Sequence, residues 1–284
     1  MKIYQVDAFT NELFKGNPAG VCILPNLKMT DNELLQNIAM EMNLSETAFL
    51  SKQNGEYRLR WFTPETEVDF CGHATLSAAH ILWEIGSENK QTTIQFNTLI
   101  GILLARYKQD NVELDFPAFK VMQIPIKKNI NRALGIESIF FGITRNKYLI
   151  EVENLQILKS IQPDFTKLKT LGRGFIITCK SEDQGYDFYS RYFAPAVGVN
   201  EDPVTGSAHS SLTPYWSKKL GKNKLLAYQA SKRGGTIGCE LAPNGRVLLS
   251  GHAITVFEID MRNEKNNERF LKTGSLADER IQRQ

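Results

Sequence analysis

An internal repeat constrains the fold of this chain more than any other feature of the sequence. Three short segments recur later in the same order: residues 60–64 (RWFTP) match 191–195 (RYFAP), 72–75 (GHAT) match 206–209 (GSAH), and 101–104 (GILL) match 238–241 (GCEL). The offsets between the first residues of the pairs are 131, 134 and 137. Self-similarity at a nearly fixed period indicates a repeated structural unit. The sequence therefore predicts two lobes of similar architecture that face each other across a pseudo-dyad.

Short segments rich in β-branched and aromatic residues predict strands in the N-terminal lobe. Residues 2–9 and 57–62 have this composition, which is typical of strands. Residues 16–20 (GNPAG) form a dense turn signal, and the apolar segment 21–24 after it predicts a further strand. By the repeat, the C-terminal lobe is expected to contain strands in the same order.

Two segments predict a buried helix, one in each lobe. Residues 74–85 are small and apolar on nearly every side and are followed by Gly86, and a helix that is apolar all round is a buried helix. The counterpart begins near Ser207 and runs to Gly221, and Pro214 is expected to start or kink it. Many strands and one buried helix per lobe predict an α+β fold in which each lobe is a barrel-like, mostly antiparallel sheet wrapped around a central helix.

One further helix is predicted in the N-terminal lobe. Residues 30–33 (TDNE) form a capping box, which marks the start of a helix. The apolar residues that follow fall on one face of that helix: Leu34, Leu35, Ile38 and Met42. This pattern predicts a helix with one side packed against the lobe.

The repeat also sets the expected lobe boundaries. The N-terminal lobe is expected to span residues 1–118, rejoined by a C-terminal segment at about 258–284, and the C-terminal lobe to span 119–257. Residues 117–125, which begin and end with proline, are expected to link the two lobes. The polar tail from Arg262 is expected to fray.

Charge and hydropathy exclude several function classes. The 284 residues carry 34 basic and 31 acidic side chains, a net charge of +3, which is too small a basic excess to indicate a nucleic-acid or anionic-membrane partner. No apolar run approaches the roughly 20 residues that cross a bilayer. The N-terminal sequence MKIYQVD lacks the apolar block of a signal peptide. We therefore expect a cytoplasmic protein.

The four cysteines and four histidines indicate neither a disulfide framework nor a metal site. They are scattered along the chain, with no CxxC pair and no HExxH segment. Disulfide-rich domains and structural zinc sites both need closer, regular spacing. The expectation is a protein with reduced thiols and no metal.

In both lobes a glycine opens the buried helix, and a polar residue follows it. These pairs are Gly72 with His73, and Gly206 with Ser207. The first N–H groups of a helix are unpaired and carry partial positive charge, so they attract anions. Two such helix starts at the cleft between the lobes could bind a carboxylate from two sides. The alternative is that the glycines only allow close packing of helix and sheet.

Four motifs resemble those of the phenazine-biosynthesis isomerase (PhzF-like) family. They are residues 17–20 (NPAG), 45–49 (SETAF), 71–75 (CGHAT) and 201–209 (EDPVTGSAH). The resemblance runs in order from residue 1 to about 258, and the last motif is long and specific. That family shares the fold of diaminopimelate epimerase, with two similar lobes and an active site between them. The resemblance thus implies the architecture that the repeat predicts.

The resemblance implies a cofactor-free isomerase that acts on a small carboxylate-bearing molecule. The type member moves a hydrogen around a dihydro-hydroxyanthranilate ring with one glutamate as acid and base. In this sequence that glutamate is Glu46. His73 and Asp202 are expected to hold or polarise the polar groups of the substrate. Ser207, with the backbone N–H groups of Gly72 and Gly206, is expected to bind its carboxylate. The resemblance and exposed strand edges also favour a homodimer.

Elementary physical chemistry is consistent with these roles. A carboxylate takes a proton from carbon effectively only if desolvation raises its pKa, and Glu46 lies in an apolar run of residues 44–50. The alternative for Glu46 is a surface glutamate near the start of a strand. His73 at a helix N-terminus is expected to be neutral, because the positive helix end disfavours imidazolium. Asp202 could instead, or in addition, cap the second helix.

Two other functions remain open from the sequence. Cys71 precedes Gly72 as the thiol of the related epimerases and racemases precedes its glycine, which would suit an amino-acid epimerase or racemase. Residues 203–206 of the C-terminal lobe hold no second cysteine, and one thiol cannot act on both faces of a carbon. A buried, inert Cys71 is therefore the preferred interpretation. The remaining alternative is a non-catalytic protein that uses the same cleft to bind a small molecule.

Overall fold

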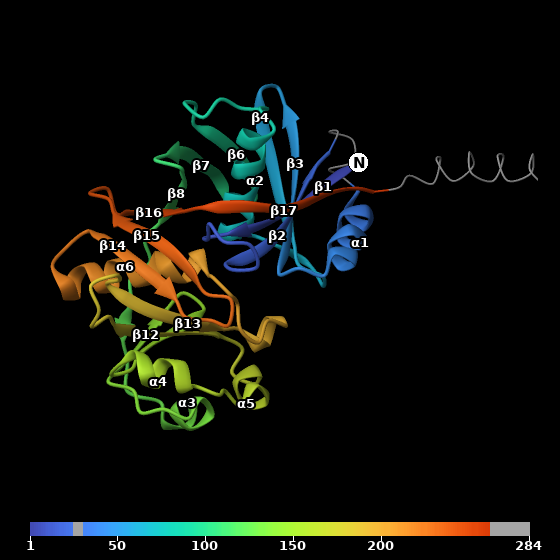
Figure 1. The fold of residues 1–284 in the computed structure, drawn as a ribbon. Coiled ribbons are helices and arrows are strands. Elements are labelled where there is room, and N and C mark those ends of the chain that lie inside the picture. The colour runs from blue at the N-terminus through green and yellow to red at the C-terminus, as the bar shows by residue number, and fades with distance from the viewer. Residues whose placement is uncertain (25–30, 262–284) are drawn as a thin grey trace, which may run out of the picture.

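A computed structural model describes residues 1–24 and 31–261 of the chain (Figure 1). The elements of the N-terminal half are, in order, β1 (Lys2–Ala8), β2 (Asn17–Ile23), α1 (Asn32–Met42), β3 (Glu46–Gln53), β4 (Glu56–Phe62), β5 (Glu67–Val68), α2 (Gly72–Glu84), β6 (Ile94–Thr98), β7 (Gly101–Lys108) and β8 (Asn111–Pro117). We count β17 (Ala253–Asp260) with this half because it pairs with β1 along its whole length.

The C-terminal half follows with a similar series of strands and a second long helix. Its elements are β9 (Met122–Gln123), α3 (Lys128–Leu134), β10 (Phe140–Thr144), β11 (Lys147–Glu151), α4 (Leu155–Ser160), α5 (Phe165–Lys169), β12 (Gly174–Lys180), β13 (Phe188–Phe193), the 3-10 turn η2 (Pro195–Val197), α6 (Gly206–Leu220), β14 (Lys224–Gln229), β15 (Gly235–Leu241) and β16 (Arg246–Gly251). In Figure 1, β12, β13 and α3 to α5 lie below the N-terminal half, and β14 to β16 lie beside it.

The strand pairing of the N-terminal half recurs in the C-terminal half. In the first half β1–β2 is antiparallel, β2–β3 parallel, β3–β4 antiparallel, β4–β6 parallel, and β6–β7 and β7–β8 antiparallel. In the second half β10–β11, β11–β12, β12–β13, β13–β14, β14–β15 and β15–β16 repeat these directions in the same order. The first two repeated sequence segments thus occupy equivalent places in this pairing. The third does not: Leu103 pairs with Phe96 and Ile237 with Ala227, so residues 101–104 correspond by register to 235–238 and not to 238–241.

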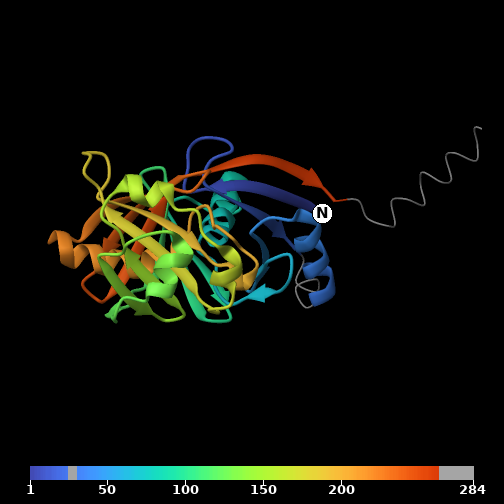
Figure 2. The ribbon, with the colours of Figure 1, turned by 90° about the horizontal axis from the view of Figure 1, so that it is seen from below.

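Two pairings connect the halves. The antiparallel pair β8–β16 joins the last strand of each series, with Leu114 opposite Leu249. The antiparallel pair β17–β1 returns the chain to the N-terminal half, with Ala253 opposite Ala8. Figures 1 and 2 both show β17 running beside β1 toward the N-terminus. The pairs link the two series of strands into one mixed α/β fold.

Helices α2 and α6 contribute to one hydrophobic core together with the surrounding strands. In α2 every residue except His80 and Glu84 is buried, as the apolar sequence predicts. Pro214 lies inside α6 and does not start it. Proline cannot donate to the carbonyl four residues earlier, and here the carbonyl of Ser210 accepts instead from the N–H of Phe119 at 2.9 Å. The helix can continue because another donor satisfies that group.

The structure corrects two further local predictions. Only Gly16 of the predicted turn has positive φ, +63°, whereas Asn17 begins β2. Pro18 is tolerated there because pairing with β3 begins only at Ala19.

The second correction concerns the start of α1. Asp31 is the N-cap of α1, because its side chain accepts a 3.0 Å hydrogen bond from the N–H of Leu34. The predicted cap, residue 30, and the tail from residue 262 lie outside the described residues.

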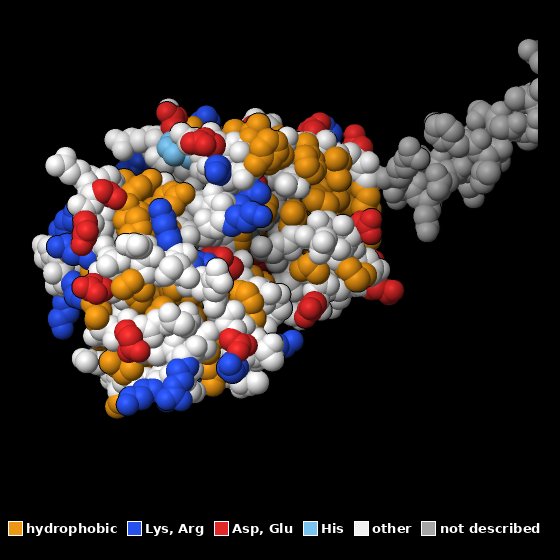
Figure 3. Space-filling model, turned by 60° about the horizontal axis from the view of Figure 1, so that its bottom comes forward, with side chains coloured by type: hydrophobic (Ala, Val, Ile, Leu, Met, Phe, Trp, Pro, Cys, Tyr) orange, Lys and Arg blue, Asp and Glu red, His pale blue; other side chains and the backbone are white. Residues whose placement is uncertain are grey.

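The surface agrees with the small net charge of the sequence. Figure 3 shows acidic and basic side chains intermixed across the face in view. Within residues 1–24 and 31–261, no helix combines the length and apolar character that a membrane span requires.

Candidate active site

Four predicted or motif residues meet where β2, β3, α2 and the segment before α6 converge. Asn17 and Glu46 are the first residues of β2 and β3, and His73 is the second residue of α2. Asp202 lies four residues before Gly206, the first residue of α6. Each side chain thus projects from the end of a regular element, and both halves of the molecule contribute to the group.

Asn17 holds this group together. Its Nδ2 lies 2.8 Å from Oδ1 of Asp202, 2.9 Å from the carbonyl oxygen of Val204 and 3.0 Å from Nδ1 of His73. The amide nitrogen has two hydrogens and accepts no hydrogen bond, so it donates to all three partners by sharing one hydrogen between two of them. Nδ1 of His73 is then an acceptor, and the proton of the neutral ring is assigned to Nε2. Sequence analysis placed Asn17 in a family motif but gave it no role.

Glu46 is in an environment suited to proton transfer at neutral pH. Its Oε2 is buried, lies 3.2 Å from Nε2 of His73 and has no hydrogen-bond partner within the described residues. Burial raises the pKa of Glu46 to about 8, and the negative charge of Asp202 adds to this shift, whereas a hydrogen bond from Cys71 opposes it. A general base works best with a pKa near the working pH. The structure thus places Glu46 in the desolvated site that this role requires.

His73 is neutral, as expected, but for a different reason. Burial lowers the pKa of His73 to about 3, since a desolvated imidazolium is costly. Its Nε2 faces Glu46, and its Nδ1 is taken up by Asn17. The ring therefore contacts the carboxylate of Glu46 directly and fixes its position.

Asp202 does not cap α6. The N-cap is Thr205, without a side-chain capping bond, and the carboxylate of Asp202 accepts instead from the hydroxyl of Thr205 and from Asn17. Burial raises the pKa of Asp202 to about 6, although these two hydrogen bonds lower it. Gln229 fixes the segment by donating to the carbonyl of Asp202 at 2.7 Å and accepting from the N–H of Thr205 at 2.9 Å. No sequence pattern pointed to Gln229, because it is remote in the chain.

The two helix starts abut at the boundary of the halves. A Cβ placed on Gly72 would lie 3.3 Å from Cα of Gly206, and one on Gly206 would lie 3.4 Å from Cα of Gly72. Neither α2 nor α6 has a side-chain capping bond among the described residues, so their first N–H groups are open to an anion. Ser207, the second residue of α6, is half-buried beside them. Close packing and anion binding are therefore compatible explanations of the glycines.

Cys71 lies in the same group. Its Sγ is 3.6 Å from Nδ1 of His73, and ligand-type atoms of Glu46, Cys71 and His73 all lie within 4.8 Å of one another. Burial, reinforced by the charge of Glu46, raises the pKa of the Cys71 thiol. The three side chains thus form one buried polar network.

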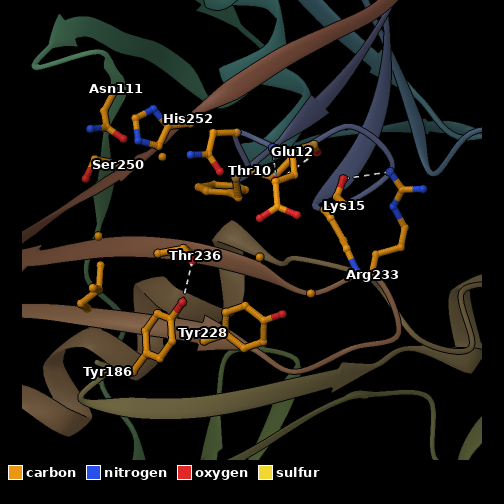
Figure 4. Close-up of a pocket in the computed structure, with 17 residues that line it drawn as sticks. Thr10, Glu12, Lys15, Asn111, Tyr186, Tyr228, Arg233, Thr236, Ser250 and His252 are labelled. Carbon is orange, nitrogen blue, oxygen red and sulfur yellow. Dashed lines mark hydrogen bonds between the residues drawn. The ribbon is translucent and has the colours of Figure 1, made fainter. Parts of the chain in front are cut away.

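A separate cavity of about 480 Å³ lies elsewhere along the boundary of the halves (Figure 4). Its wall includes Glu12 and Lys15 of the β1–β2 loop, Tyr228 of β14 and His252. Arg233 at its edge is held by Asp7 and by the carbonyl of Lys15. None of the residues that line this cavity belongs to the Glu46 group.

Comparison with known proteins agrees with this architecture. The family model described as phenazine biosynthesis-like protein (PhzC-PhzF) matches residues 6–259. An uncharacterised isomerase of Halalkalibacterium halodurans is 52% identical over 91% of this chain and 97% of its own length. The human phenazine biosynthesis-like domain-containing protein is 42% identical over 91% of this chain and 98% of its own.

Solved structures show the same relationship. A PhzF-family protein of Enterococcus faecalis superposes with a TM-score of 0.87 at 40% identity and covers 92% of this chain and 99% of its own. A hydroxyproline epimerase of Agrobacterium vitis, at 13% identity and a TM-score of 0.59, covers 91% of both chains and shares the fold. The family resemblance read from the four motifs is confirmed: the chain belongs to the PhzC-PhzF, phenazine biosynthesis-like family.

Proposed function

We propose that this chain is a cofactor-independent isomerase that moves a proton between carbons of a small carboxylate-bearing substrate, with Glu46 as acid and base. The observation that carries the proposal is the buried Oε2 of Glu46, which forms no aligned hydrogen bond within the described residues and lies 3.2 Å from Nε2 of His73. A purely structural glutamate would have its buried oxygen satisfied. Relatives from Halalkalibacterium halodurans and Pseudomonas aeruginosa that are named isomerases support the reaction class.

In this proposal the substrate lies between two pseudo-symmetric, barrel-like lobes. Glu46 in its ionised form removes a proton from one carbon, and the electron pair left on that carbon shifts into the adjoining double bond. Protonated Glu46 then returns the proton to the carbon at the far end of the shifted system. Charge that develops on the substrate is stabilised by preorganised donors. The candidates are the N–H groups of Gly72 and Gly206, with the hydroxyl of Ser207.

His73 and Asp202 support this transfer from opposite sides of Asn17. His73 positions the carboxylate of Glu46, and Asp202 accepts from an amino or hydroxyl group of the substrate. Because the pKa of Asp202 is raised less than that of Glu46, the two carboxyl groups differ in protonation at neutral pH. Such a pair assigns the proton carrier to Glu46 and leaves Asp202 as the charged partner.

The arrangement disfavours the epimerase alternative. Residue 205 stands in the C-terminal half where Cys71 stands in the N-terminal half, at the offset of 134 residues found for the helix starts, and it is threonine. Its hydroxyl is bonded to Asp202. Inversion at carbon by two thiols needs a cysteine at both equivalent positions, and only Cys71 is present there.

Hydrogen–deuterium exchange tests the proposal. Wild-type protein and Glu46→Gln are incubated in D₂O with dihydro-hydroxyanthranilate and a panel of cyclic and linear amino and hydroxy acids, and NMR follows deuterium entry at carbon. We expect exchange in wild type and a loss of about 10²–10⁴-fold in the variant, the usual contribution of a positioned acid–base group. Glu12→Gln, in the separate cavity, is the matched control and should exchange like wild type.

Equal exchange in wild type and Glu46→Gln would remove Glu46 as the base and direct attention to Cys71. Exchange from no compound in the panel would favour a small-molecule-binding protein. Exchange with inversion at the carbon would instead support an epimerase.

A further inference from the structure

Strand register places Lys147 at the end of the sheet that carries the Glu46 group in the other half. In the N-terminal half Ala19 of β2, two residues beyond Asn17, pairs with Glu46 of β3. In the C-terminal half Lys147, the first residue of β11, pairs with Gly174 of β12. Because Gly174 is the counterpart of Glu46, as the next pair of strands shows, Lys147 corresponds to Ala19.

The counterpart of Glu46 is a glycine. The equivalent cross-strand pairs are Thr47–Phe62 and Phe175–Phe193, since residues 60–64 and 191–195 are the repeated segments. Glu46 precedes the first pair on β3, and Gly174 precedes the second on β12. The C-terminal half therefore has no carboxylate at the position that corresponds to Glu46.

The side chain of Tyr192 fills the place that this glycine leaves. A Cβ on Gly174 would lie 2.2 Å from the hydroxyl oxygen of Tyr192. Tyr192 belongs to β13 and precedes Phe193, so it is the counterpart of Trp61. The ammonium of Lys147 lies 5.9 Å from the centre of the Tyr192 ring, and Lys147 pairs directly with Gly174. A phenol and an ammonium therefore replace the carboxylate group.

Both groups are hydrogen-bond donors that interact electrostatically with carboxylates of the Glu46 group. Burial and the negative charges of Asp202 and Glu46 raise the pKa of Tyr192, so it keeps its proton. Burial and Arg145 lower the pKa of Lys147 to about 8, while Asp202 opposes this shift. Lys147 forms no salt bridge among the described residues, and its Nζ donates to Oδ1 of Asn146 at 3.4 Å. A partly buried cation without a carboxylate partner is suited to an anionic ligand.

We propose that Lys147 and Tyr192 bind an anionic oxygen of the substrate from the C-terminal half, opposite Glu46. The proposal rests on the proposed function, because it takes the Glu46 group as the place of reaction. The anionic oxygen has two possible sources. It is either a carboxylate of the bound substrate or the oxyanion that forms when Glu46 removes a proton beside a carbonyl or carboxyl group. Donors aimed at either oxygen are worth more in a desolvated site than in water.

The test separates these sources by measuring binding and exchange in the same variants. Lys147→Met and Tyr192→Phe remove one donor each and keep most of the side-chain volume. NMR titration measures binding of anthranilate, a stable aromatic carboxylate, and of anthranilamide, its uncharged amide. The matched controls are Lys180→Met, at the exposed far end of β12, and Tyr186→Phe, whose hydroxyl bonds to Thr236 outside the site.

If the ligand is a substrate carboxylate, Lys147→Met weakens anthranilate binding at least 10-fold, leaves anthranilamide binding unchanged, and is partly rescued by Lys147→Arg. If it is the oxyanion, binding is unchanged and Tyr192→Phe and Lys147→Met each slow deuterium exchange at least 10-fold. The proposal is overturned if both variants match their controls in binding and in exchange, or if wild type prefers the amide. Failure of the proposed function is a different result: Glu46→Gln exchanges normally, while the binding measurements still decide on Lys147 and Tyr192.

Discussion

The two halves of the molecule share a backbone plan but differ in chemistry. The same six strand pairings surround a long helix in each half. At the equivalent position on the third strand, one half has Glu46 and the other Gly174, beside Tyr192. Pairing and helix burial depend on the apolar pattern along each strand. Side chains at strand ends are not bound by that pattern, so they can differ without changing the fold.

Some polar features are shared by both halves, and these are structural. Arg60 donates through Nε and Nη2 to both carboxylate oxygens of Glu67, each at 2.7 Å. Its counterpart Arg191 makes the same bidentate pair with Glu201, at 2.7 and 3.0 Å. Each arginine thus binds a glutamate in the segment just before the long buried helix of its half, α2 or α6. The arginine–glutamate pairs are therefore common to both halves and form a shared framework, whereas the residues of the candidate site differ between the halves.

The largest expected effect is on this shared framework. Arg60→Ala and Arg191→Ala should each destabilise the protein by about 3 kcal/mol, because each removes a mostly buried guanidinium together with its bidentate, charge-assisted hydrogen bonds. For a chain of this size that lowers Tm by roughly 6–10 °C. Thermal unfolding followed by circular dichroism measures both variants.

The control is Lys2→Ala, which breaks the exposed pair with Glu258, where both side chains are 52% exposed. It should leave Tm close to that of the wild type, because an exposed ion pair contributes little to stability. If only one of the two arginine variants loses thermal stability, the two halves are not equivalent at this position.

A smaller effect concerns the cost of keeping Glu46 buried. The pKa of Glu46 is raised from 4.5 to about 8, so between these values the folded protein holds a proton that the unfolded chain releases. Stability of the wild type must therefore fall as pH rises through this window. Glu46→Gln escapes this loss, and we expect a gain on the order of 2 kcal/mol at pH 8 and little gain below pH 4.5. Urea unfolding across this range measures the difference.

Glu151 of the C-terminal half is a buried glutamate that, unlike Glu46, has hydrogen-bond partners for its carboxylate. Glu151 is also buried, but Lys219 lies 2.7 Å from its Oε1 and Tyr215 donates to its Oε2. Glu151→Gln should therefore destabilise the protein at pH 8. If both variants change stability in the same direction, the distinction between a functional and a structural buried glutamate is wrong.

The sequence predicted the features that depend on local pattern. The repeat, the buried helix α2 and the strands β1 and β4 could be read from apolar spacing and from turn and cap residues. The sequence predicted a turn over residues 16–20, but β2 already begins at Asn17. Glycine and proline also occur at the start of strands, so they do not show where a turn ends. Pro214 was misplaced because its effect depends on Phe119, a partner 95 residues away in the chain.

Site residues were predictable only where a motif contained them. The structure brings Glu46, His73 and Asp202 together as the family resemblance implied, but through Asn17, whose partner Asp202 is 185 residues away. Lys147 lies in no motif, and Tyr192 lies in the repeated segment 191–195 but in none of the four family motifs. Their placement emerges only when strand register aligns the halves, because register is fixed by tertiary pairing and not by local composition.

The smallest expected effect tests whether the negative charge of Asp202 in the C-terminal half raises the pKa of Glu46 in the N-terminal half. Asp202 raises the pKa of Glu46 through its negative charge, after the larger effect of burial. Asp202→Asn removes that charge and should lower the Glu46 titration midpoint by about 0.5–1 unit, worth up to about 1.4 kcal/mol. Carbon-13 NMR of the labelled Glu46 carboxyl measures it without a substrate, with Glu46→Gln identifying the signal. Glu201→Gln, which loses its charge while pairing with Arg191, should shift the midpoint less. A midpoint that stays put or rises in Asp202→Asn would mean that Glu46 is tuned by burial within its own half, and that the two halves divide the site without electrostatic coupling.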